Sequence, residues 1–346
     1  MTGFWACVNP RTLPHPVQFW SPHFPRSAMD PSPRLDALVA PLRADVVSGA
    51  AVVARMACEV MRRAAGRIDA ETPEEVRAGL AQVGLLVLDA QPAMAPLVAL
   101  VSDILDAVEG ADGADGAREA ARSAADAFRA GLETRSQVVA ARTAAVLPRS
   151  GAILTLSSSS TVRGALLHGA GRRSGRVVVL ESRPMQEGHL LAAALGKAGV
   201  PVTVAVDAAV ATLVPRCAMV LLGADSVGDL GVVNKVGSLA AAEAARRAGV
   251  PVVVATDETK ILPIGFPQHL ADDRPGDEVC RSQVGVKVWN RYFEAVPLDA
   301  VTSLVTEAAT LSPEEVERHR TGIRVPDEVR AWADRRGLGD PPDLLI

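Results

Sequence analysis

Five short apolar runs, separated by helical segments, constrain this sequence more than any other feature. The runs occupy residues 152–156, 177–180, 202–206, 219–222 and 252–255. Nearly all of their side chains are apolar, which is typical of parallel strands covered on both faces. The segments between them have helical patterns of roughly 10–15 residues, the spacing expected of β-α-β units. The sequence therefore predicts an α/β fold with a Rossmann-like, doubly wound, mostly parallel sheet over residues 148–330.

An all-helical domain is predicted before this sheet, over residues 34–147. Apolar residues recur at helical spacing from Leu35 to Ala65, and a further helix is expected to end near Val108. Thr72-Pro73-Glu74-Glu75 has the order of a helix start, with an N-cap, a first-turn proline and an acidic third residue.

A glycine-rich segment and a polar C-terminal segment predict two more boundaries between elements. A glycine-rich loop is expected at 110–116, before a long helix that runs from Ala117 to about Ala145. A capped helix is predicted to begin at Ser312, and a polar tail is expected at 331–346.

Residues 1–33 differ in composition from the rest of the chain. They hold five of the eleven aromatic residues and seven of the 24 prolines. No basic segment followed by an apolar one occurs, so a signal peptide is not predicted. Two interpretations stay open: an irregular arm that packs on the body, or a segment that precedes a translation start at Met29.

Composition excludes several classes of function. The 36 basic and 40 acidic residues give a net charge of −4, which argues against a general nucleic-acid binder. No uncharged apolar run is long enough for a membrane span. The four cysteines show no metal-binding spacing, so we expect a cytoplasmic protein without a disulfide framework, metal or cofactor.

The basic residues are very unevenly divided, with 32 arginines but only four lysines. This bias suggests a high-GC, bacterial genome. Lys235 and Lys260 follow predicted strands, where a lysine retained against such a bias is expected to have a site role. Lys197 and Lys287 have no such context, and we expect them on the surface.

Polar residues at the carboxyl ends of the strands form the predicted site, because ligands of open α/β sheets bind there. Ser157, Ser158 and Ser159 follow the first strand and lead into a helix, a position that suits phosphate. Arg183 follows the second strand and could make a bidentate phosphate contact. The alternatives are a serine-rich helix cap without a ligand and a surface ion pair of Arg183.

A carboxylate and two lysines follow the later strands. Asp225 follows the fourth strand after Gly223-Ala224 and is a candidate acid/base group. Asn234 and Lys235 lie in a glycine-flanked run, 231–237, that indicates close backbone approach. Lys260 follows the fifth strand and is a candidate phosphate ligand. The alternative is a structural ion pair between Asp225 and Lys235.

Four ordered segments give these residues a family context: ILTLSSSSTV at 153–162, ESRPMQEGHLLAAAL at 181–195, GADSVGDLGVVNKVGSL at 223–239, and FEAVP at 293–297 with Thr306-Glu307. Over residues 35–315 the sequence resembles the family of the alpha, beta and delta subunits of eukaryotic translation initiation factor 2B, ribose-1,5-bisphosphate isomerase and methylthioribose-1-phosphate isomerase. The resemblance implies a helical domain before a Rossmann-like domain, and a homodimer or higher homo-oligomer formed through the latter.

The resemblance also implies roles for single residues. The isomerases use a Cys and an Asp, which match Ser157 and Asp225 here, and their Asn-Lys pair matches Asn234-Lys235. Their phosphate-binding Arg-Gly-Ala motif matches Ser48-Gly49-Ala50, so Gly49 and Ala50 remain while the Arg is replaced. A serine hydroxyl does not titrate near neutral pH and needs a neighbouring base to act as a nucleophile.

Two classes of function remain. The first is a protein that binds a phosphorylated sugar or nucleotide between its domains and, if it is an enzyme, isomerises a sugar phosphate by altered chemistry. The second is a non-catalytic oligomeric scaffold or a regulatory protein of the initiation factor 2B type.

Overall fold

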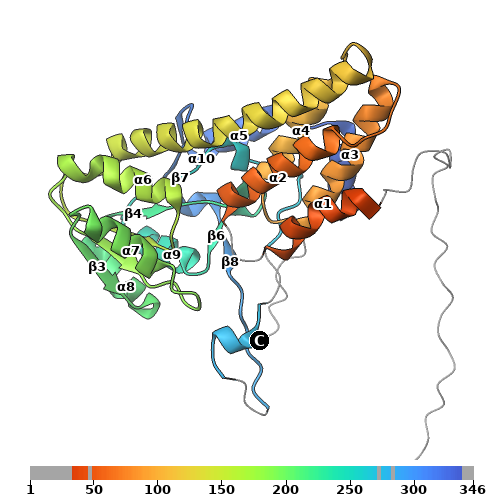
Figure 1. The fold of residues 1–346 in the computed structure, drawn as a ribbon. Helices are drawn as coiled ribbons and strands as arrows, with labels where there is room; N and C mark the ends of the chain where they lie inside the picture. The colour runs from red at the N-terminus through yellow and green to blue at the C-terminus, as the bar shows by residue number, and fades with distance from the viewer. Residues whose placement is uncertain (1–32, 46–48, 271–273, 282–284, 337–346) are drawn as a thin grey trace, which may run out of the picture.

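The computed structural model describes residues 33–45, 49–270, 274–281 and 285–336. Within them the chain forms a helical half followed by a sheet half, and the long helix α5 (Gly113–Val146) runs along both (Figure 1). The region predicted as an N-terminal arm, and Ser48, lie outside the described residues, apart from Pro33 at the start of α1.

The helical half is built from amphipathic helices around an apolar core. Thr72 and Glu75 form a complete capping box, which confirms the helix start predicted there. The four helices before α5 are α1 (Pro33–Ala44), α2 (Ala50–Ala65), α3 (Pro73–Ala90) and α4 (Pro96–Val108).

One detail of the helix prediction is wrong. The stretch over residues 35–65 is helical as predicted and forms α1 and α2. The expected loop at 110–116 is shorter, because α5 already begins at Gly113. Glycine costs little in a first helical turn, since the N–H groups there have no intrahelical partner.

Seven strands form the main sheet, in the order β10-β9-β7-β4-β1-β2-β3. All neighbouring pairs are parallel except β10 and β9. The predicted strands are confirmed, two of them with small changes at an end. The bounds are β1 (Ala152–Leu156), β2 (Val177–Leu180), β3 (Val202–Ala205), β4 (Cys217–Leu222), β7 (Val252–Ala255), β9 (Ser303–Val305) and β10 (Thr310–Leu311).

Helices cover both faces of this sheet. Ile153, Val179 and Leu221 pack in the core beneath α5, α6 (Ser160–Gly169) and α7 (Gly188–Lys197). Leu154 and Val178 pack in the opposite core, beneath α8 (Val210–Leu213), α9 (Ser238–Ala248) and α10 (Pro313–Gly322). The doubly wound sheet follows from this alternation of side chains.

A small antiparallel sheet crosses the carboxyl side of the main one. Its strands are β5 (Ser226–Gly228), β6 (Gly231–Lys235) and β8 (Phe293–Val296), in the order β5-β6-β8. Gly231 has a φ of +96°, and a Cβ there would lie 2.2 Å from the carbonyl oxygen of Val296. The close backbone approach predicted for the run 231–237 is therefore confirmed at Gly231.

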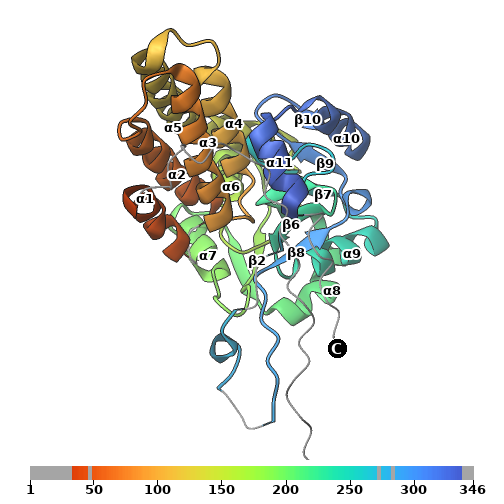
Figure 2. The same ribbon diagram turned by 90° about the vertical axis from the view of Figure 1, so that its right-hand side faces the viewer.

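The last described helix, α11 (Asp327–Arg336), returns to the helical half (Figure 2). Val329, Trp332 and Ala333 are buried in the core that α3 and α4 share. The tail predicted at 331–346 thus starts within a packed helix. The sequence predicts a polar tail here because most residues of α11 are charged, although its buried apolar residues Val329, Trp332 and Ala333 have helical spacing.

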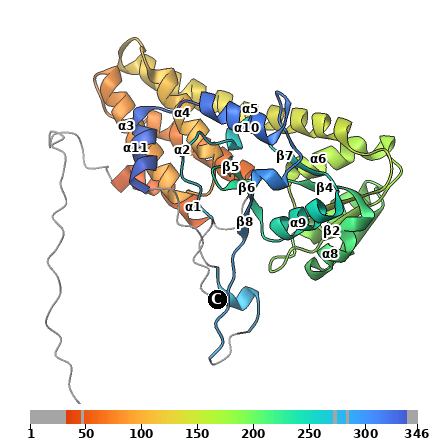
Figure 3. The same ribbon diagram turned by 180° about the vertical axis from the view of Figure 1, so that it is seen from behind.

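Six short 3₁₀ helices complete the elements of the described residues. They are η1 (Ala170–Arg172), η2 (Asp207–Ala209), η3 (Val214–Arg216), η4 (Glu258–Lys260), η5 (Gly276–Glu278) and η6 (Leu298–Ala300). The described parts of the segment between Gln268 and β8 extend away from the body (Figures 1 and 3).

Candidate functional site

The loop after β1 brings the serine run to the carboxyl edge of the sheet. Ser157 has a φ of 60°, in the left-handed region that non-glycine residues rarely adopt. Its N–H donates to the Oγ of Ser182 at 2.6 Å. Ser159 is the N-cap of α6, and its Oγ accepts from the N–H of Val162 at 3.3 Å. Ser157, Ser158 and Ser159 are all half-buried.

The loop after β2 is held in place by Asp207. Its two carboxylate oxygens accept from the N–H groups of Ser182 at 2.8 Å and Arg183 at 2.7 Å. The guanidinium of Arg183 is exposed and donates to the carbonyl oxygen of Val279 at 3.0 Å. Among the described residues Arg183 thus contacts backbone carbonyl oxygens and not a carboxylate, so the surface ion pair considered above is not formed within them.

Asp225 follows β4 and is half-buried. Its N–H donates to the carbonyl oxygen of Val233 at 2.8 Å, which ties it to β6. Burial raises the pKa of Asp225, and the positive charges of Lys260 and Lys235 oppose this shift. The carboxyl group thus holds its proton at higher pH than an ordinary aspartate does.

The segment before Asp225 approaches the serine loop. A Cβ at Gly223 would lie 2.8 Å from the Oγ of Ser159 and 3.8 Å from the Oδ1 of Asn234. Asn234 is buried and donates through Nδ2 to the Oγ of Ser238 at 2.9 Å. The structure therefore brings Ser159, Gly223 and Asn234 together, although they lie on three separate segments.

Lys260 is positioned by the last motif that the resemblance rests on. Its ammonium donates to the carbonyl oxygen of Ala224 at 2.7 Å, directly before Asp225. Lys260 lies on η4, where the carboxylate of Glu307 accepts from the N–H of Glu258 at 3.0 Å. Thr306 also donates to Glu258, at 3.3 Å. The Thr306-Glu307 pair thus anchors the segment that carries Lys260.

Lys235 has an anionic partner that sequence reasoning missed. Its ammonium lies 2.7 Å from the Oε1 of Glu187 and 4.3 Å from the centre of the Tyr292 ring. The side chain of Lys235 is only 5% exposed. The sole sequence signal for Glu187 is its place in the loop after β2, because its partner lies 48 residues away.

The charges of this group are balanced. Lys235 is paired with Glu187, and Lys260 and Lys235 both act on Asp225. Lys235, Lys260, Glu187 and Asp225 therefore carry two formal charges of each sign. The alternative of an ion pair between Lys235 and Asp225 is replaced by the contact with Glu187.

Glu294 gives the FEAVP segment a structural role at the start of α9. Its Oε1 accepts from the N–H groups of Gly237 at 2.8 Å and Leu239 at 2.7 Å, at the start of α9. Burial raises the pKa of Glu294, and these backbone N–H groups oppose the shift. The carboxylate lies at the N-terminus of α9, which begins three residues after Lys235.

Gly49 and Ala50 form the start of α2. Gly49 is the N-cap, without a side-chain cap, and Ala50 is buried. Within the described ranges, no hydrogen bond joins either residue to the serine loop or to Asp225. Their predicted role at a phosphate therefore stays a prediction.

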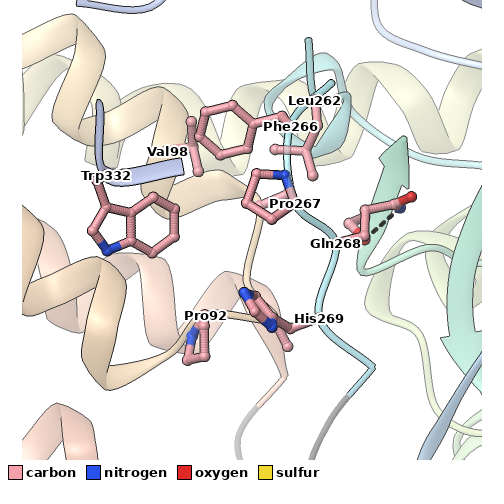
Figure 4. Close-up of a pocket in the computed structure, with 11 residues that line it drawn as sticks. Pro92, Val98, Leu262, Phe266, Pro267, Gln268, His269 and Trp332 are labelled. Atoms are coloured by element: carbon pink, nitrogen blue, oxygen red, sulfur yellow. Dashed lines mark hydrogen bonds between the residues drawn. The ribbon is translucent and has the colours of Figure 1, made fainter. Parts of the chain in front are cut away.

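Two pockets of the structure lie away from the predicted site residues. One of about 10 Å³ lies between the segment 262–269, α4 and α11, where the rings of Phe266 and Trp332 are 6.0 Å apart (Figure 4). It has room for about one water molecule. The other, of about 620 Å³, lies on α1 and α2 beside Leu38 and Met56. Neither is lined by a predicted site residue.

Across the part of the chain that the structure describes, no three His, Cys, Asp or Glu residues are grouped to hold a metal ion. None of the helices in the same ranges is long and apolar enough to cross a membrane.

Comparison with known proteins places this geometry in a family. Residues 46–313 match the model of the Initiation factor 2 subunit family. The chain belongs to this family, as its four ordered segments indicate.

Particular relatives include both isomerases and initiation factors. The chain is 30% identical over 280 residues to ribose 1,5-bisphosphate isomerase of Haloferax volcanii, covering 78% of this chain and 86% of the relative. It is 36% identical over 165 residues to methylthioribose-1-phosphate isomerase of Oleidesulfovibrio alaskensis, covering 44% and 46%. The solved translation initiation factor eIF-2B of Pyrococcus horikoshii matches with a TM-score of 0.69 and 24% identity, covering 81% of this chain and 98% of that one, and shows the shared fold.

Proposed function

We propose that this protein binds a phosphorylated sugar at the carboxyl edge of its sheet and interconverts its aldose and ketose forms. The observation that carries the proposal is the position of Asp225, a half-buried carboxyl group of raised pKa that lies within the electrostatic influence of Lys235 and Lys260. Perturbed carboxyl groups of this kind occur preferentially at functional sites. The relatives named as sugar-phosphate isomerases support the same class of reaction.

The proton balance of the reaction suits a single carboxyl group. In a cyclic aldose 1-phosphate, a proton must reach the ring oxygen as its bond to C1 breaks. The hydrogen on C2 then moves to C1 with its electron pair, and the C2 hydroxyl loses a proton as it becomes a carbonyl. One proton is given and one is taken, so Asp225 can donate first and accept afterwards. Its raised pKa favours the protonated form that starts the cycle.

The other predicted site residues bind and orient in this scheme. Ser157, Ser158 and Ser159 offer hydroxyl groups at the α6 N-terminus to a phosphate. Gly49 and Ala50 offer N–H groups at the α2 N-terminus, which has no capping side chain. Because Ser157 does not ionise near neutral pH, it acts as a hydrogen-bonding group where the isomerases have a cysteine. Asn234, Lys235 and Lys260 place the sugar against Asp225, and Arg183 contacts a phosphate at the rim.

The proposed setting follows the family. We place the protein in the cytoplasm as a homodimer or larger homo-oligomer, and the free thiols of Cys58, Cys217 and Cys280 support a reducing compartment.

A panel of phosphate ligands tests the proposal. Ribose 1,5-bisphosphate, AMP and related sugar phosphates are added separately, and thermal unfolding and turnover to the ketose are measured. We expect ribose 1,5-bisphosphate to raise the unfolding temperature and to be converted. The proposal fails if both measurements stay flat across the whole panel.

A non-catalytic scaffold is the second candidate. It is favoured by the serine in place of the isomerase cysteine and by the pairing of Lys235 with Glu187. In that case the charged group stabilises the fold alone, and Asp225→Asn leaves ligand binding unchanged while stability falls. Loss of turnover in an intact fold excludes this candidate.

A further inference from the structure

Tyr292 is fixed beside Lys235 by the backbone of the small sheet. Its carbonyl oxygen accepts from the N–H of Val236 at 2.8 Å, and the next residue, Phe293, is the strand partner of Lys235 in the pairing of β6 with β8. The centre of the Tyr292 ring lies 4.3 Å from the ammonium of Lys235. The pairing of these two strands therefore places the ring against this lysine.

The hydroxyl end of Tyr292 is held as well. It donates to the Oε2 of Glu278 at 2.7 Å, and the Nδ2 of Asn290 donates to the same oxygen at 2.8 Å. Asn290 is buried, and its Nδ2 also donates to the carbonyl oxygen of Pro275 at 2.8 Å. Burial, with the hydrogen bond to Glu278, raises the pKa of Tyr292 to about 12, so the phenol stays neutral. The ring is thus fixed both at its backbone and at its hydroxyl group.

A fixed ring limits the freedom of the long lysine side chain. The ammonium of a lysine is a compact charge on a flexible four-carbon stem. Among the described residues Lys235 has one carboxylate partner, the Oε1 of Glu187 at 2.7 Å, and this single contact leaves rotations of the stem open. The ring face of Tyr292 is a second contact that restricts them. Attraction between a cation and a ring is strongest away from water, and the Lys235 side chain is only 5% exposed.

We propose that Tyr292 is a positioning residue of the candidate site: its ring holds the ammonium of Lys235 in one place, beside Glu187 and within electrostatic reach of Asp225. The inference rests on the proposed function, because Asp225 is the proposed acid/base group and the charge of Lys235 acts on it. The interaction of two charges depends on their separation, so a displaced ammonium changes the balance between the two forms of the carboxyl group. Tyr292 acts through Lys235 and needs no contact with the ligand.

Three replacements at position 292 separate the ring from the rest of the side chain. Tyr292→Phe keeps the ring and removes the hydroxyl, whereas Tyr292→Leu removes the ring. Pentafluorophenylalanine in place of Tyr292 keeps the shape of a ring but reverses the charge of its face, which abolishes the attraction for a cation. The matched control is Trp289→Leu, because Trp289 is 62% exposed and its ring centre lies 5.9 Å from the guanidinium of Arg291, on the same segment.

The first measurement follows Lys235 itself. The chain has only four lysines, so NMR of ¹³C-labelled lysine gives few signals, and Lys235→Arg identifies the one that belongs to Lys235. Protons above the face of an aromatic ring are shifted upfield. We therefore expect the ε protons of Lys235 to lie upfield of those of Lys197, Lys260 and Lys287 in the wild type and in Tyr292→Phe, and to return to the ordinary lysine range in Tyr292→Leu. This measurement needs neither ligand nor activity.

The second measurement is turnover of ribose 1,5-bisphosphate by the same variants. We expect Tyr292→Leu and the fluorinated variant to lower kcat by about two- to thirtyfold, the range of an interaction between a cation and a ring. Tyr292→Phe and Trp289→Leu should keep the wild-type kcat. A purely structural role of Tyr292 would lower the unfolding temperature and leave kcat, measured well below that temperature, unchanged.

The contrary outcomes are distinct. If the ε protons of Lys235 lie in the ordinary range in the wild type, the ring does not hold the ammonium and the inference is overturned. If they are shifted but Tyr292→Leu and the fluorinated variant keep the wild-type kcat, the placement has no role in the reaction and the inference is overturned too. If the wild type neither binds nor converts ribose 1,5-bisphosphate, the proposed function fails, and the role of Tyr292 in it falls even where the NMR shift is present. Should Tyr292→Leu not fold, a wild-type kcat in the fluorinated variant overturns the inference on its own.

Discussion

The carboxyl edge of the sheet and the helical half differ in backbone conformation and in the burial of their charged side chains. Non-glycine residues with positive φ occur among the described residues at Ser157, Ser182 and Gln186, all in the loops after β1 and β2. Two charged side chains at the same edge are buried or half-buried, namely Lys235 and Asp225. In the helical half the ion pairs are mostly exposed and local, such as Arg62 with Glu59 at 2.9 Å.

This difference separates residues that hold the fold from residues available for chemistry. Strained backbone and buried charge both cost stability, and they persist where the surrounding structure over-determines them. In this protein the two costs coincide at one edge, while the helices follow the local rules of capping and amphipathicity. Substitutions at the edge should therefore change activity, and substitutions in the helical half should change stability.

The largest effect is expected for Asp225→Asn. Loss of the acid/base group should lower turnover of ribose 1,5-bisphosphate by about 100- to 10,000-fold. Stability should not fall, because the ionised carboxylate is held in a buried setting. Steady-state kinetics and denaturant unfolding measure the two quantities. Normal turnover in this variant would remove Asp225 from the mechanism.

The same variant makes a pH prediction. The raised pKa means that the folded protein binds this proton more tightly than the unfolded chain does. The stabilisation is complete below the ordinary aspartate pKa and is lost as the pH rises through the folded value. The stability difference, Asp225→Asn minus wild type, should therefore grow with pH from acidic to neutral conditions. A difference that shrinks over this range contradicts the burial assigned to Asp225.

Trp332→Ala is the counterpart in the helical half. The ring of Trp332 is buried on α11, and its indole N–H donates to Asp89 at 2.8 Å. Removing it should lower the free energy of unfolding by about 3–5 kcal/mol. Turnover measured well below the new unfolding temperature should stay at the wild-type level. A loss of turnover in a fully folded variant would show that the two regions are coupled.

Gly223→Ala should show an intermediate effect at the edge. Its new Cβ would lie 2.8 Å from the Oγ of Ser159, the N-cap of α6. Displacing this cap should cost about 1 kcal/mol of stability, and we expect affinity for ribose 1,5-bisphosphate to fall by about tenfold. Calorimetry and thermal unfolding give both values. Unchanged affinity would place the ligand away from the serine loop.

Gly116→Ala should have the smallest effect, of opposite sign. Gly116 lies in the first turns of α5, and a Cβ there would meet open space. Alanine should raise the free energy of unfolding by about 0.5–1 kcal/mol, because it loses less backbone entropy than glycine. Ligand affinity should not change. A destabilised variant would mean that this turn of α5 is less regular than described.

Local patterns specified most of the fold but only part of the candidate site. The runs at 152–156, 177–180 and 252–255 match β1, β2 and β7 residue for residue, since continuous apolar segments can only be covered on both faces. The helix starts at Thr72 and Ser312 are complete capping boxes, which sequence spacing alone can indicate. These features depend on neighbours a few residues away.

What the sequence could not show depends on distant partners. Asp225 and Lys260 were expected at strand ends, and the structure brings both beside Ala224. The pairing of Lys235 with Glu187 depends on how the loop after β2 turns at Gly188, which no local pattern encodes. The small sheet was missed as well, because β5 and β8 are too short for their periodicity to stand out.

The position of α11 has a consequence for the order of folding. The helix is made last among the described elements, yet it fills the core of the half that is made first. During synthesis, α3 and α4 leave the ribosome long before Trp332 can cover them. The part of the helical core that α11 covers therefore stays exposed until the sheet half and α11 have both emerged.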